Sequence, residues 1–515
     1  MYSIKIVTIN YLKYIELGVK MEQFKNYING KWVAPVSGNY FNNISPANQE
    51  DIIGEFPLSG QEDVDNAVKA ANEAFKTWKR MPAPKRGDIL RIAGDIFTRR
   101  KKELGRVMTR EMGKPTFETE GDVQEAIDTA YYAASETRRL FGNTAPSEME
   151  NKVNMTFRVP IGVCGIITAW NFPVAVPSWK ILPALAAGNT VVFKPSKDAP
   201  QSGVVMAEIL EEAGVPKGVF NLVLGTGRMG NMLVEHPDIN LIGFTGSTDI
   251  GFKIGEICGR TNKICSLEMG GKNAQIVMPD ANFDLAIEGV LWGAFGTTGQ
   301  RCTATSRLII HKDCYDEIIE KLAARTVKLK LGDGLVAGND VGPVIHETSL
   351  KNVENYVKIA VEEGGRLVCG GKRATGGDLD KGCFYEPTII ADVTRDKRLF
   401  NEEVFGPLLC VSKAESFEDS IEMQNHCDFG LSSSIYTRNV NQAFAAMRDI
   451  EAGITYINAP TIGAEAHMPF GGVKGTGNGH REGGTTVFDI FTEWKTVYVD
   501  FSDELQRAQI DNYDD

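Results

Sequence analysis

The chain alternates between segments in which apolar residues recur at helical spacing and short runs rich in β-branched residues. The helical spacing predicts amphipathic helices over residues 62–78, 88–113 and 202–216. The β-rich runs cover residues 162–169, 190–195, 218–225 and 241–247. Because helices separate these runs, the pattern predicts a doubly wound parallel sheet in an α/β fold, and a second alternating region extends from residue 279 to 475.

The two ends of the chain carry different signals. Residues 21–33 predict a strand and a turn around Asn29 and Gly30. Residues 486–501 predict a long exposed strand in need of a partner. Residues 1–20 contain charges that interrupt the apolar core of a signal peptide. We expect residues 1–20 to be either a translated leader, with Met21 as the natural start, or a mobile tail.

Length and charge narrow the class of protein. The 515 residues suggest about three domains. The chain has 67 acidic and 55 basic side chains and no basic stripe, which disfavours binding to nucleic acid. No apolar run approaches the roughly 18 residues that would span a bilayer, so we expect no membrane role.

The nine cysteines are scattered and odd in number. They form no C-x-x-C pair and no cluster with histidine at the spacing of a zinc site, which disfavours a metal centre. This pattern favours reduced thiols in a cytoplasmic protein.

Two glycine-rich loops follow predicted strands. Residues 225–230, GTGRMG, match G-x-G-x-x-G, and residues 246–251, GSTDIG, resemble it. One such loop is weak evidence, but two loops that each lead into a helix favour phosphate binding, because helix N-termini present unpaired N–H groups. Neither loop has the lysine of a P-loop, so a dinucleotide is the better interpretation.

Cys302 lies in the stretch FGTTGQRCTATSR, among small, polar and basic residues rather than apolar ones. Small neighbours allow close approach of a second molecule, and the adjacent Arg301 can lower the pKa of a thiol. Both features suit a nucleophile, although a structural thiol remains the alternative.

Six motifs occur together and in order: TAWNFPVAVPSWK, FTGSTDIG, LEMGGKN, FGTTGQRCTA, EEVFGP and MPFGGVKGTG. With them the chain resembles the aldehyde dehydrogenase superfamily from residue 27 to residue 499. The resemblance implies a Rossmann-like dinucleotide-binding domain from residues 21–141 and 161–276, an α/β catalytic domain from residues 277–480, and a small β oligomerisation element from residues 142–160 and 484–503. It also implies a homodimer or homotetramer.

The resemblance assigns three catalytic positions. Cys302 matches the nucleophile that forms a thiohemiacetal and then a thioester, and Asn171 matches the amide donor to the oxyanion. Glu268 matches the general base for thioester hydrolysis; a solvated charge at a strand end is its alternative. A Cys–His hydrolase using His467 or His480, or a binding protein on the same fold, would be weaker interpretations.

The resemblance also implies NAD or NADP as cofactor. Strongly NAD-selective relatives carry a glutamate three residues after the lysine of FKPS, and here that residue is Lys197. A cation at this position would attract a 2′-phosphate, so we expect NADP to be accepted. The positions that match cofactor contacts are Trp170, Lys194, Ser196, Lys197, Gly227, Gly230, Gly246, Ser247, Gly251, Met269, Glu403 and Phe405.

The substrate prediction depends on the loop NAPTIGAEAHMPFGG, which resembles the 2-aminoadipate semialdehyde dehydrogenase branch. The resemblance implies that Arg301, Gly463 and Ala464 bind a substrate carboxylate and that Glu125 binds an amine. Phe172, Trp179 and Phe470 match aromatic residues of the substrate tunnel. We expect a carboxylate-bearing semialdehyde, 2-aminoadipate 6-semialdehyde or a similar compound; the alternatives are succinate or 2-oxoglutarate semialdehyde and a broad-specificity enzyme.

Overall fold

The computed structural model describes residues 21–510, so the expected leader or tail at residues 1–20 lies outside the described residues. A first sheet has the strand order β11–β10–β7–β8–β9–β1–β2. Its five parallel strands are β11 (Ile264–Glu268), β10 (Leu241–Thr245), β7 (Val163–Ile167), β8 (Thr190–Lys194) and β9 (Phe220–Leu222). The predicted strand and turn form a hairpin at the antiparallel edge, with β1 (Asn26–Ile28) and β2 (Lys31–Val33). Asn29 and Gly30 both have positive φ in its turn.

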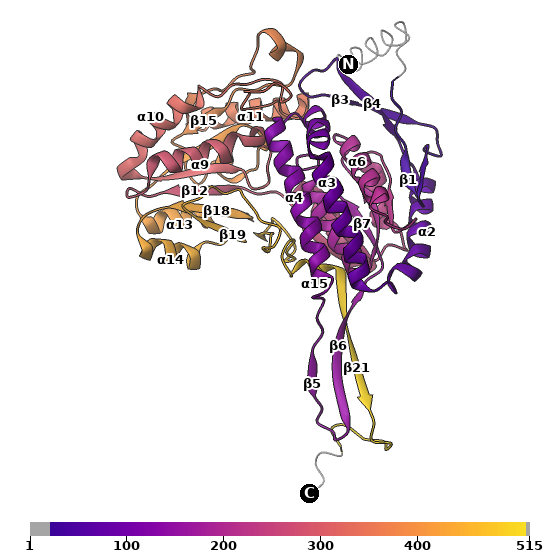
Figure 1. Cartoon of the computed structure of the whole chain (residues 1–515). Helices are drawn as coiled ribbons and strands as arrows, with labels where there is room; N and C mark the ends of the chain where they lie inside the picture. Colours follow the sequence, from indigo (N-terminus) through magenta and orange to yellow (C-terminus); the bar gives the residue numbers. More distant parts are fainter. Residues whose placement is uncertain (1–20, 511–515) are drawn as a thin grey trace.

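Seven helices surround this sheet. They are α2 (Gln61–Trp78), α3 (Ala83–Met112), α4 (Thr116–Glu136), α5 (Ala175–Ala187), α6 (Pro200–Glu212), α7 (Gly227–Glu235) and α8 (Thr248–Thr261). Helices α3 and α4 lie alongside each other on the outside (Figure 1). The predicted parallel α/β arrangement is confirmed, although α3 begins earlier than predicted because Pro84 suits the first turn of a helix.

A second sheet has the order β14–β15–β16–β13–β12–β18–β19, and only β14 is antiparallel to its neighbour. Its strands are β14 (Arg366–Cys369), β15 (Thr388–Ala391), β16 (Leu408–Ala414), β13 (Thr305–His311), β12 (Asn273–Val277), β18 (Ser432–Tyr436) and β19 (Ile454–Ile457). The accompanying helices are α9 (Phe283–Phe295), α10 (Tyr315–Thr326), α11 (Glu347–Glu362), α12 (Arg398–Asn401), α13 (Phe417–Asn425) and α14 (Val440–Asp449). Because β12 belongs to this sheet, the chain changes sheets between residues 268 and 273, before the predicted boundary at 276/277.

A three-stranded arm projects from the body (Figure 1). It consists of β5 (Thr144–Pro146), β6 (Lys152–Pro160) and β21 (Thr492–Asp500), and β6 pairs with β21 along its full length. The predicted strand at 486–501 is wrong in its first part, which forms the helix α15 (Val487–Phe491). The four apolar side chains of α15 are buried, and the helix packs against α5; this packing overrides their β propensity. Trp494 and Tyr498 remain exposed on β21.

Two short sheets complete the architecture. Strand β3 (Tyr40–Ile44) pairs with β4 (Ile52–Pro57), and β17 (Phe429–Gly430) pairs with β20 (Val473–Lys474). No helix within residues 21–510 is long and apolar enough to cross a lipid bilayer.

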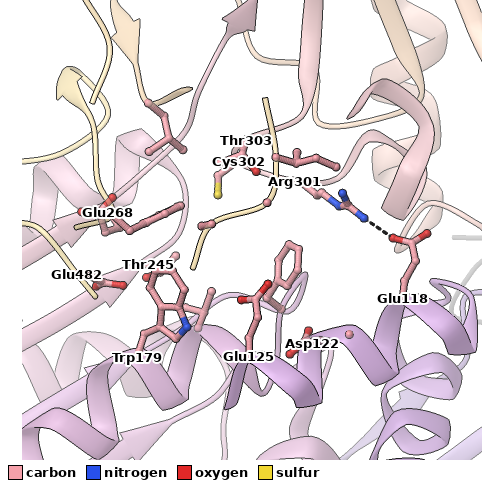
Figure 2. Close-up of a pocket in the computed structure, with 18 of the residues that line it drawn as sticks. Glu118, Asp122, Glu125, Trp179, Thr245, Glu268, Arg301, Cys302, Thr303 and Glu482 are labelled. Atoms are coloured by element: carbon pink, nitrogen blue, oxygen red, sulfur yellow. Dashed lines mark hydrogen bonds and ion pairs between the residues drawn. The ribbon is translucent and has the colours of Figure 1, made fainter. Parts of the chain in front are cut away.

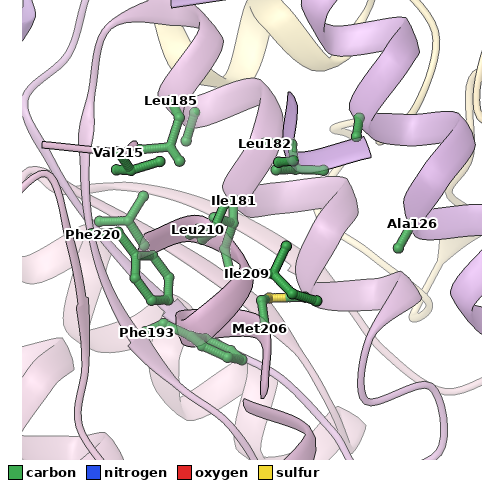
Figure 3. Packing of buried hydrophobic residues seen from close by; sticks show 14 of the residues in the cluster. Ala126, Ile181, Leu182, Leu185, Phe193, Met206, Ile209, Leu210, Val215 and Phe220 are labelled. Carbon is green, nitrogen blue, oxygen red and sulfur yellow. The ribbon is translucent and has the colours of Figure 1, made fainter. Parts of the chain in front are cut away.

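The largest core lies between the first sheet and its helices, where Leu185, Phe193, Ile209 and Phe220 pack together (Figure 3). All four side chains are at most 1% exposed. This packing fixes the relative positions of α5, α6 and β8, and the last of these ends at the predicted cofactor site.

Replacing Leu185 by alanine should lower the free energy of unfolding by about 2–5 kcal/mol, because it leaves a cavity in this core. Leu505→Ala is a matched control, since Leu505 is 84% exposed. Thermal unfolding of both variants should give a clearly lower Tm for Leu185→Ala alone. Equal Tm values would contradict the packing described.

Candidate active site

Cys302 follows α9 and a short 3₁₀ turn, η1 (Gly296–Gly299), and precedes β13. It therefore lies in a tight connection between a helix and a central strand of the second sheet. Its thiol is partly accessible and lines a cavity of about 280 Å³. Removal from bulk water, with smaller contributions from the nearby Glu403 and Glu268 carboxylates, raises the pKa of the thiol to about 12.

The same cavity contains all seven residues that the sequence predicted to contact substrate. These residues are Glu125, Phe172, Trp179, Arg301, Gly463, Ala464 and Phe470. Figure 2 shows Arg301 and Cys302 on one wall, with Glu125 and Trp179 on the helices opposite. The rings of Trp179 and Phe470 meet edge to face, with centroids 5.0 Å apart, so the wall near them is aromatic.

Glu268 is the last residue of β11, and its carboxylate lines the cavity. Neither carboxylate oxygen has a hydrogen-bond partner within residues 21–510. Burial raises the pKa of Glu268 to about 8, while Lys180 and Arg481 act in the opposite direction. A carboxylate with this pKa and no fixed donor is suited to accept a proton near neutral pH.

Lys180 and Glu482 form a buried ion pair near Glu268. Lys180 comes from α5 and is 1% exposed, and burial lowers its pKa to about 7. Glu482 lines the cavity. Lys180 therefore places a titratable cation close to the candidate base.

Two asparagines hold the backbone around Cys302. The Asn273 amide donates to the Cys302 carbonyl at 2.7 Å and to the Ala304 carbonyl at 2.9 Å. The Asn171 amide donates to the Gln300 carbonyl at 3.1 Å. Asn171 is thus brought to the nucleophile loop, as the sequence predicted, although it is not among the residues that line the cavity.

The carboxyl ends of the parallel strands meet at the edge of the first sheet that faces this loop. Ile167 lies opposite Lys194 and Thr245 lies opposite Glu268 in the strand register. The N-terminus of α8 follows directly after Gly246 and Ser247. This arrangement of strand ends and a helix N-terminus is typical of a dinucleotide site.

The four glycines predicted to contact the cofactor differ in how much space surrounds them. An added Cβ at Gly251 would lie 2.2 Å from the Met269 sulfur, and one at Gly246 would meet the Phe244 ring at 2.5 Å. At Gly227 nothing lies within 4 Å of that position, and at Gly230 the nearest atom is Cδ of Lys194 at 3.8 Å. The first two glycines are required by packing, whereas the loop at α7 leaves open space beside Lys194.

Several buried polar groups at this edge fit a dinucleotide. Lys194 is 5% exposed, and within residues 21–510 its ammonium donates only to the adjacent Pro195 carbonyl, at 2.9 Å. Burial lowers its pKa to about 8. The Thr245 hydroxyl has no partner within the described part of the chain. Ribose hydroxyls could satisfy such groups, so the residues fit the cofactor.

Glu403 and Phe405 line a small pocket together with Gly271 and Arg301. The Glu403 carboxylate accepts the Gly271 N–H at 3.0 Å, and burial raises its pKa to about 7. Phe405 meets Trp170 edge to face at 5.7 Å. These three predicted cofactor residues therefore lie within reach of the nucleophile loop.

Lys197 is exposed, and its ammonium pairs with Asp198 at 2.8 Å. Asp198 also accepts the Ser196 hydroxyl at 3.2 Å. The cation that the sequence predicted as a partner for a 2′-phosphate is therefore shared with a neighbouring carboxylate.

Arg301 is more constrained than the sequence indicated. Its Nη2 pairs with Glu118 at 2.5 Å and its Nε donates to the Thr297 hydroxyl at 2.9 Å. The guanidinium also lies over the Trp292 ring. Only Nη1 has no hydrogen-bond partner among the described residues, so one nitrogen of the predicted carboxylate ligand stays available.

Five residues of this site were missed by the sequence analysis. Lys180, Asn273 and Glu482 lie within or beside the quoted motifs, but their roles depend on contacts between distant segments. Glu118 and Asp122 lie on α4, about two turns and one turn before Glu125, and helical spacing could have placed them on its face.

Comparison with known proteins agrees with this geometry. Residues 32–497 match the aldehyde dehydrogenase family. The chain belongs to that family. It is 40% identical to an alpha-ketoglutaric semialdehyde dehydrogenase of Bacillus subtilis, over 92% of this chain and 98% of the relative. It is 39% identical to the NADP(+) succinate-semialdehyde dehydrogenase of Escherichia coli, over 92% and 97%.

Solved structures agree with the family assignment. An aldehyde dehydrogenase structure from Burkholderia cenocepacia superposes with a TM-score of 0.92 at 35% identity and covers 95% of this chain and 99% of its own. The betaine aldehyde dehydrogenase of Staphylococcus aureus in complex with NAD+ gives a TM-score of 0.92 at 32% identity, over 96% and 98%. The predicted fold and the predicted NAD(P)-dependent aldehyde oxidation are confirmed.

Proposed function

We propose that this aldehyde dehydrogenase oxidises a carboxylate-bearing semialdehyde to the dicarboxylic acid through a thioester on Cys302. The observation that carries the proposal is the content of one cavity. It joins the thiol of Cys302, and the Glu268 carboxylate that has no hydrogen-bond partner within residues 21–510, to groups that can hold a charged substrate.

The chemistry begins at the Cys302 sulfur, which attacks the aldehyde carbon. The oxyanion that forms would be held by backbone N–H groups of the loop, which already face the sulfur, and by the remaining N–H of the Asn171 amide. Bound NAD or NADP supplies a hydride acceptor. Loss of hydride leaves a thioester on Cys302.

Hydrolysis of that thioester needs an activated water, and Glu268 is the proposed base. Its two unpartnered oxygens can accept a proton from water, and the nearby Lys180 lowers the pKa that burial raises. The base must be deprotonated to act, so hydrolysis should accelerate as the pH rises through about 8.

Removing Lys180 should move the pH at which the hydrolysis rate rises upward by on the order of one unit. The reason is that the cation that favours the charged form of Glu268 is lost. The double variant Lys180→Met/Glu482→Gln avoids an uncompensated buried carboxylate. Single-turnover formation of the acid product, measured against pH, tests the shift. Lys253→Met, on the exposed face of α8, is the control. If the pH profile of the double variant matched that of the unmodified enzyme, the role of Lys180 would be contradicted.

The case for a substrate carboxylate comes from three donors that line the cavity. Gly463 and Ala464 have backbone N–H groups without partners within residues 21–510, and Nη1 of Arg301 is unpaired as well. Gly463 has φ +113°, and nothing lies within 4 Å of its missing Cβ, so a ligand can approach its backbone. A carboxylate would satisfy these donors and share the guanidinium with Glu118.

The case for an amine comes from Glu125. Its carboxylate lines the cavity and has no hydrogen-bond or ion-pair partner among residues 21–510, and burial raises its pKa to about 8. A protonated amine would stabilise its charged form. Asp128 and Glu465 line an adjoining depression that shares Glu125 and Ala464, so the approach is acidic as well. These features favour 2-aminoadipate 6-semialdehyde over succinate or 2-oxoglutarate semialdehyde.

Three aldehydes of equal chain length separate these interpretations: hexanal, 6-oxohexanoate, and 2-amino-6-oxohexanoate. We expect kcat/KM to rise in that order. Arg301→Gln should lower the preference for 6-oxohexanoate over hexanal by about ten- to a hundredfold, the value of one charge-assisted contact. Glu125→Gln should lower the preference for the amino compound over 6-oxohexanoate by about tenfold.

Other results would redirect the assignment. Equal kcat/KM for hexanal and 6-oxohexanoate would indicate a broad-specificity enzyme. Higher values for 2-oxoglutarate or succinate semialdehyde would retain the semialdehyde class and exclude the amine. Absorbance at 340 nm reports turnover in each assay, and an active Cys302→Ser variant would rule out the thioester route.

For the cofactor, we propose that NADP is accepted alongside NAD. The Lys197 ammonium can exchange Asp198 for a 2′-phosphate, and both side chains lie near Ser196 at the end of β8. Lys197→Glu should move the ratio of kcat/KM values toward NAD. A preference of the unmodified enzyme for NAD above about a hundredfold, roughly 2.7 kcal/mol, would contradict this assignment.

We further propose that the enzyme is a cytoplasmic homo-oligomer built through the arm. Apolar side chains on the arm are exposed, among them Phe157, Trp494 and Tyr498, and a second copy could cover them. All nine cysteines lie within the described residues and none is paired, which supports a reducing compartment.

A further inference from the structure

The turn that precedes Cys302 has an unfavourable backbone. Thr297 and Thr298 have φ values of 50° and 58°, followed by Gly299 at 68°. Left-handed conformation is uncommon and unfavourable for β-branched residues. The turn persists only if surrounding contacts hold it, and its shape determines where the Cys302 sulfur lies.

Glu118 provides three of those contacts from a single buried carboxylate. Its Oε1 accepts the Thr297 N–H at 3.0 Å, and its Oε2 accepts the Thr297 hydroxyl at 2.6 Å and Nη2 of Arg301 at 2.5 Å. The Glu118 side chain is 2% exposed. Figure 2 shows Arg301 reaching from the nucleophile loop toward Glu118.

Further contacts of the loop come from the segment that precedes α11. The Thr298 hydroxyl donates to the Gly342 carbonyl at 3.1 Å, and the Ile345 N–H donates to the Gln300 side chain at 2.9 Å. Glu118 instead belongs to α4, which packs against α3 and α5 beside the first sheet. It therefore ties the nucleophile loop to the part of the chain that forms the cofactor edge.

The ion pair also controls charge next to the nucleophile. Arg301 is adjacent to Cys302 in sequence, and an unpaired guanidinium beside a thiol favours the thiolate. Glu118 pairs with the guanidinium and so compensates its charge. The carboxylate thus acts on both the position and the ionisation of the thiol.

We propose that Glu118 is a positioning residue for aldehyde oxidation: from α4 it holds the left-handed turn at Thr297 and the guanidinium of Arg301, and so sets the position of Cys302. The inference rests on the proposed role of Cys302 as the nucleophile. The effect on Cys302 applies to neutral aldehydes as well as charged ones, since it acts through the loop that carries the nucleophile.

Turnover of hexanal tests the positioning effect. Glu118→Ala should lower kcat on the order of a hundredfold, the effect of a small displacement of a reacting group. Glu118→Gln keeps an acceptor for the Thr297 N–H and should lower kcat about tenfold, so the conservative variant rescues part of the activity. Glu120→Gln, on the same helix and without a polar contact, should leave kcat unchanged.

Alkylation of Cys302 by iodoacetamide tests the charge effect. The rate is followed against pH by mass spectrometry of the peptide that contains Cys302. In Glu118→Gln the charge of Arg301 is uncompensated, so the profile should move to lower pH by about one unit. The double variant Glu118→Gln/Arg301→Gln should return it toward that of the unmodified enzyme.

Two outcomes would overturn the proposal. One is a folded Glu118→Gln variant with unchanged hexanal kcat and an unchanged alkylation profile. The other is a Glu118→Ala variant that loses kcat together with Tm, while the alkylation profiles of Glu118→Ala and Glu118→Gln both match that of the unmodified enzyme. This result would indicate a purely structural role for Glu118. An active Cys302→Ser variant would instead refute the proposed function, so the two failures are distinguishable.

Discussion

The active site depends on one short crossing of the chain between its two sheets. Strand β11 ends at Glu268 and β12 begins at Asn273, so four residues carry the chain from the cofactor edge to the strand beside the nucleophile. Added Cβ atoms would lie 2.4 Å from the Glu403 carboxylate at Gly270 and 2.4 Å from the Cys302 carbonyl at Gly271. Only glycine allows so close an approach, and it places the base, the cofactor carboxylate and the nucleophile around one point.

The charges around that point are mostly arranged in pairs. Lys180 pairs with Glu482, Lys114 with Asp122, and Arg301 with Glu118, and in each pair both side chains are at most 7% exposed. Pairing satisfies charges that would otherwise be costly to bury. Glu268 and Glu125 line the same cavity but have no hydrogen-bond or ion-pair partner within residues 21–510, so they can respond to water or substrate.

Helix α4 links these pairs to the chemistry. Asp122 accepts the Lys114 ammonium at 2.8 Å, and Lys114 also donates to the Asn171 carbonyl at 3.0 Å. Glu118 holds the opposite side through Thr297 and Arg301. One face of α4 therefore supports both the candidate oxyanion donor and the nucleophile loop, and Glu125 on the same helix faces the substrate cavity.

The sequence by itself determined the alternation of strands and helices, the turn at Asn29 and Gly30, and the candidate residues Cys302, Glu268 and Asn171, because local periodicity and short motifs encode these features. It did not determine that residues 487–491 form a helix, because burial against α5 decides their conformation. Nor did it determine that Arg301 is held by Glu118, since 183 residues separate them. Only the tertiary structure brings such side chains together, and the burial that results is what shifts the pKa values of Cys302 and Glu268.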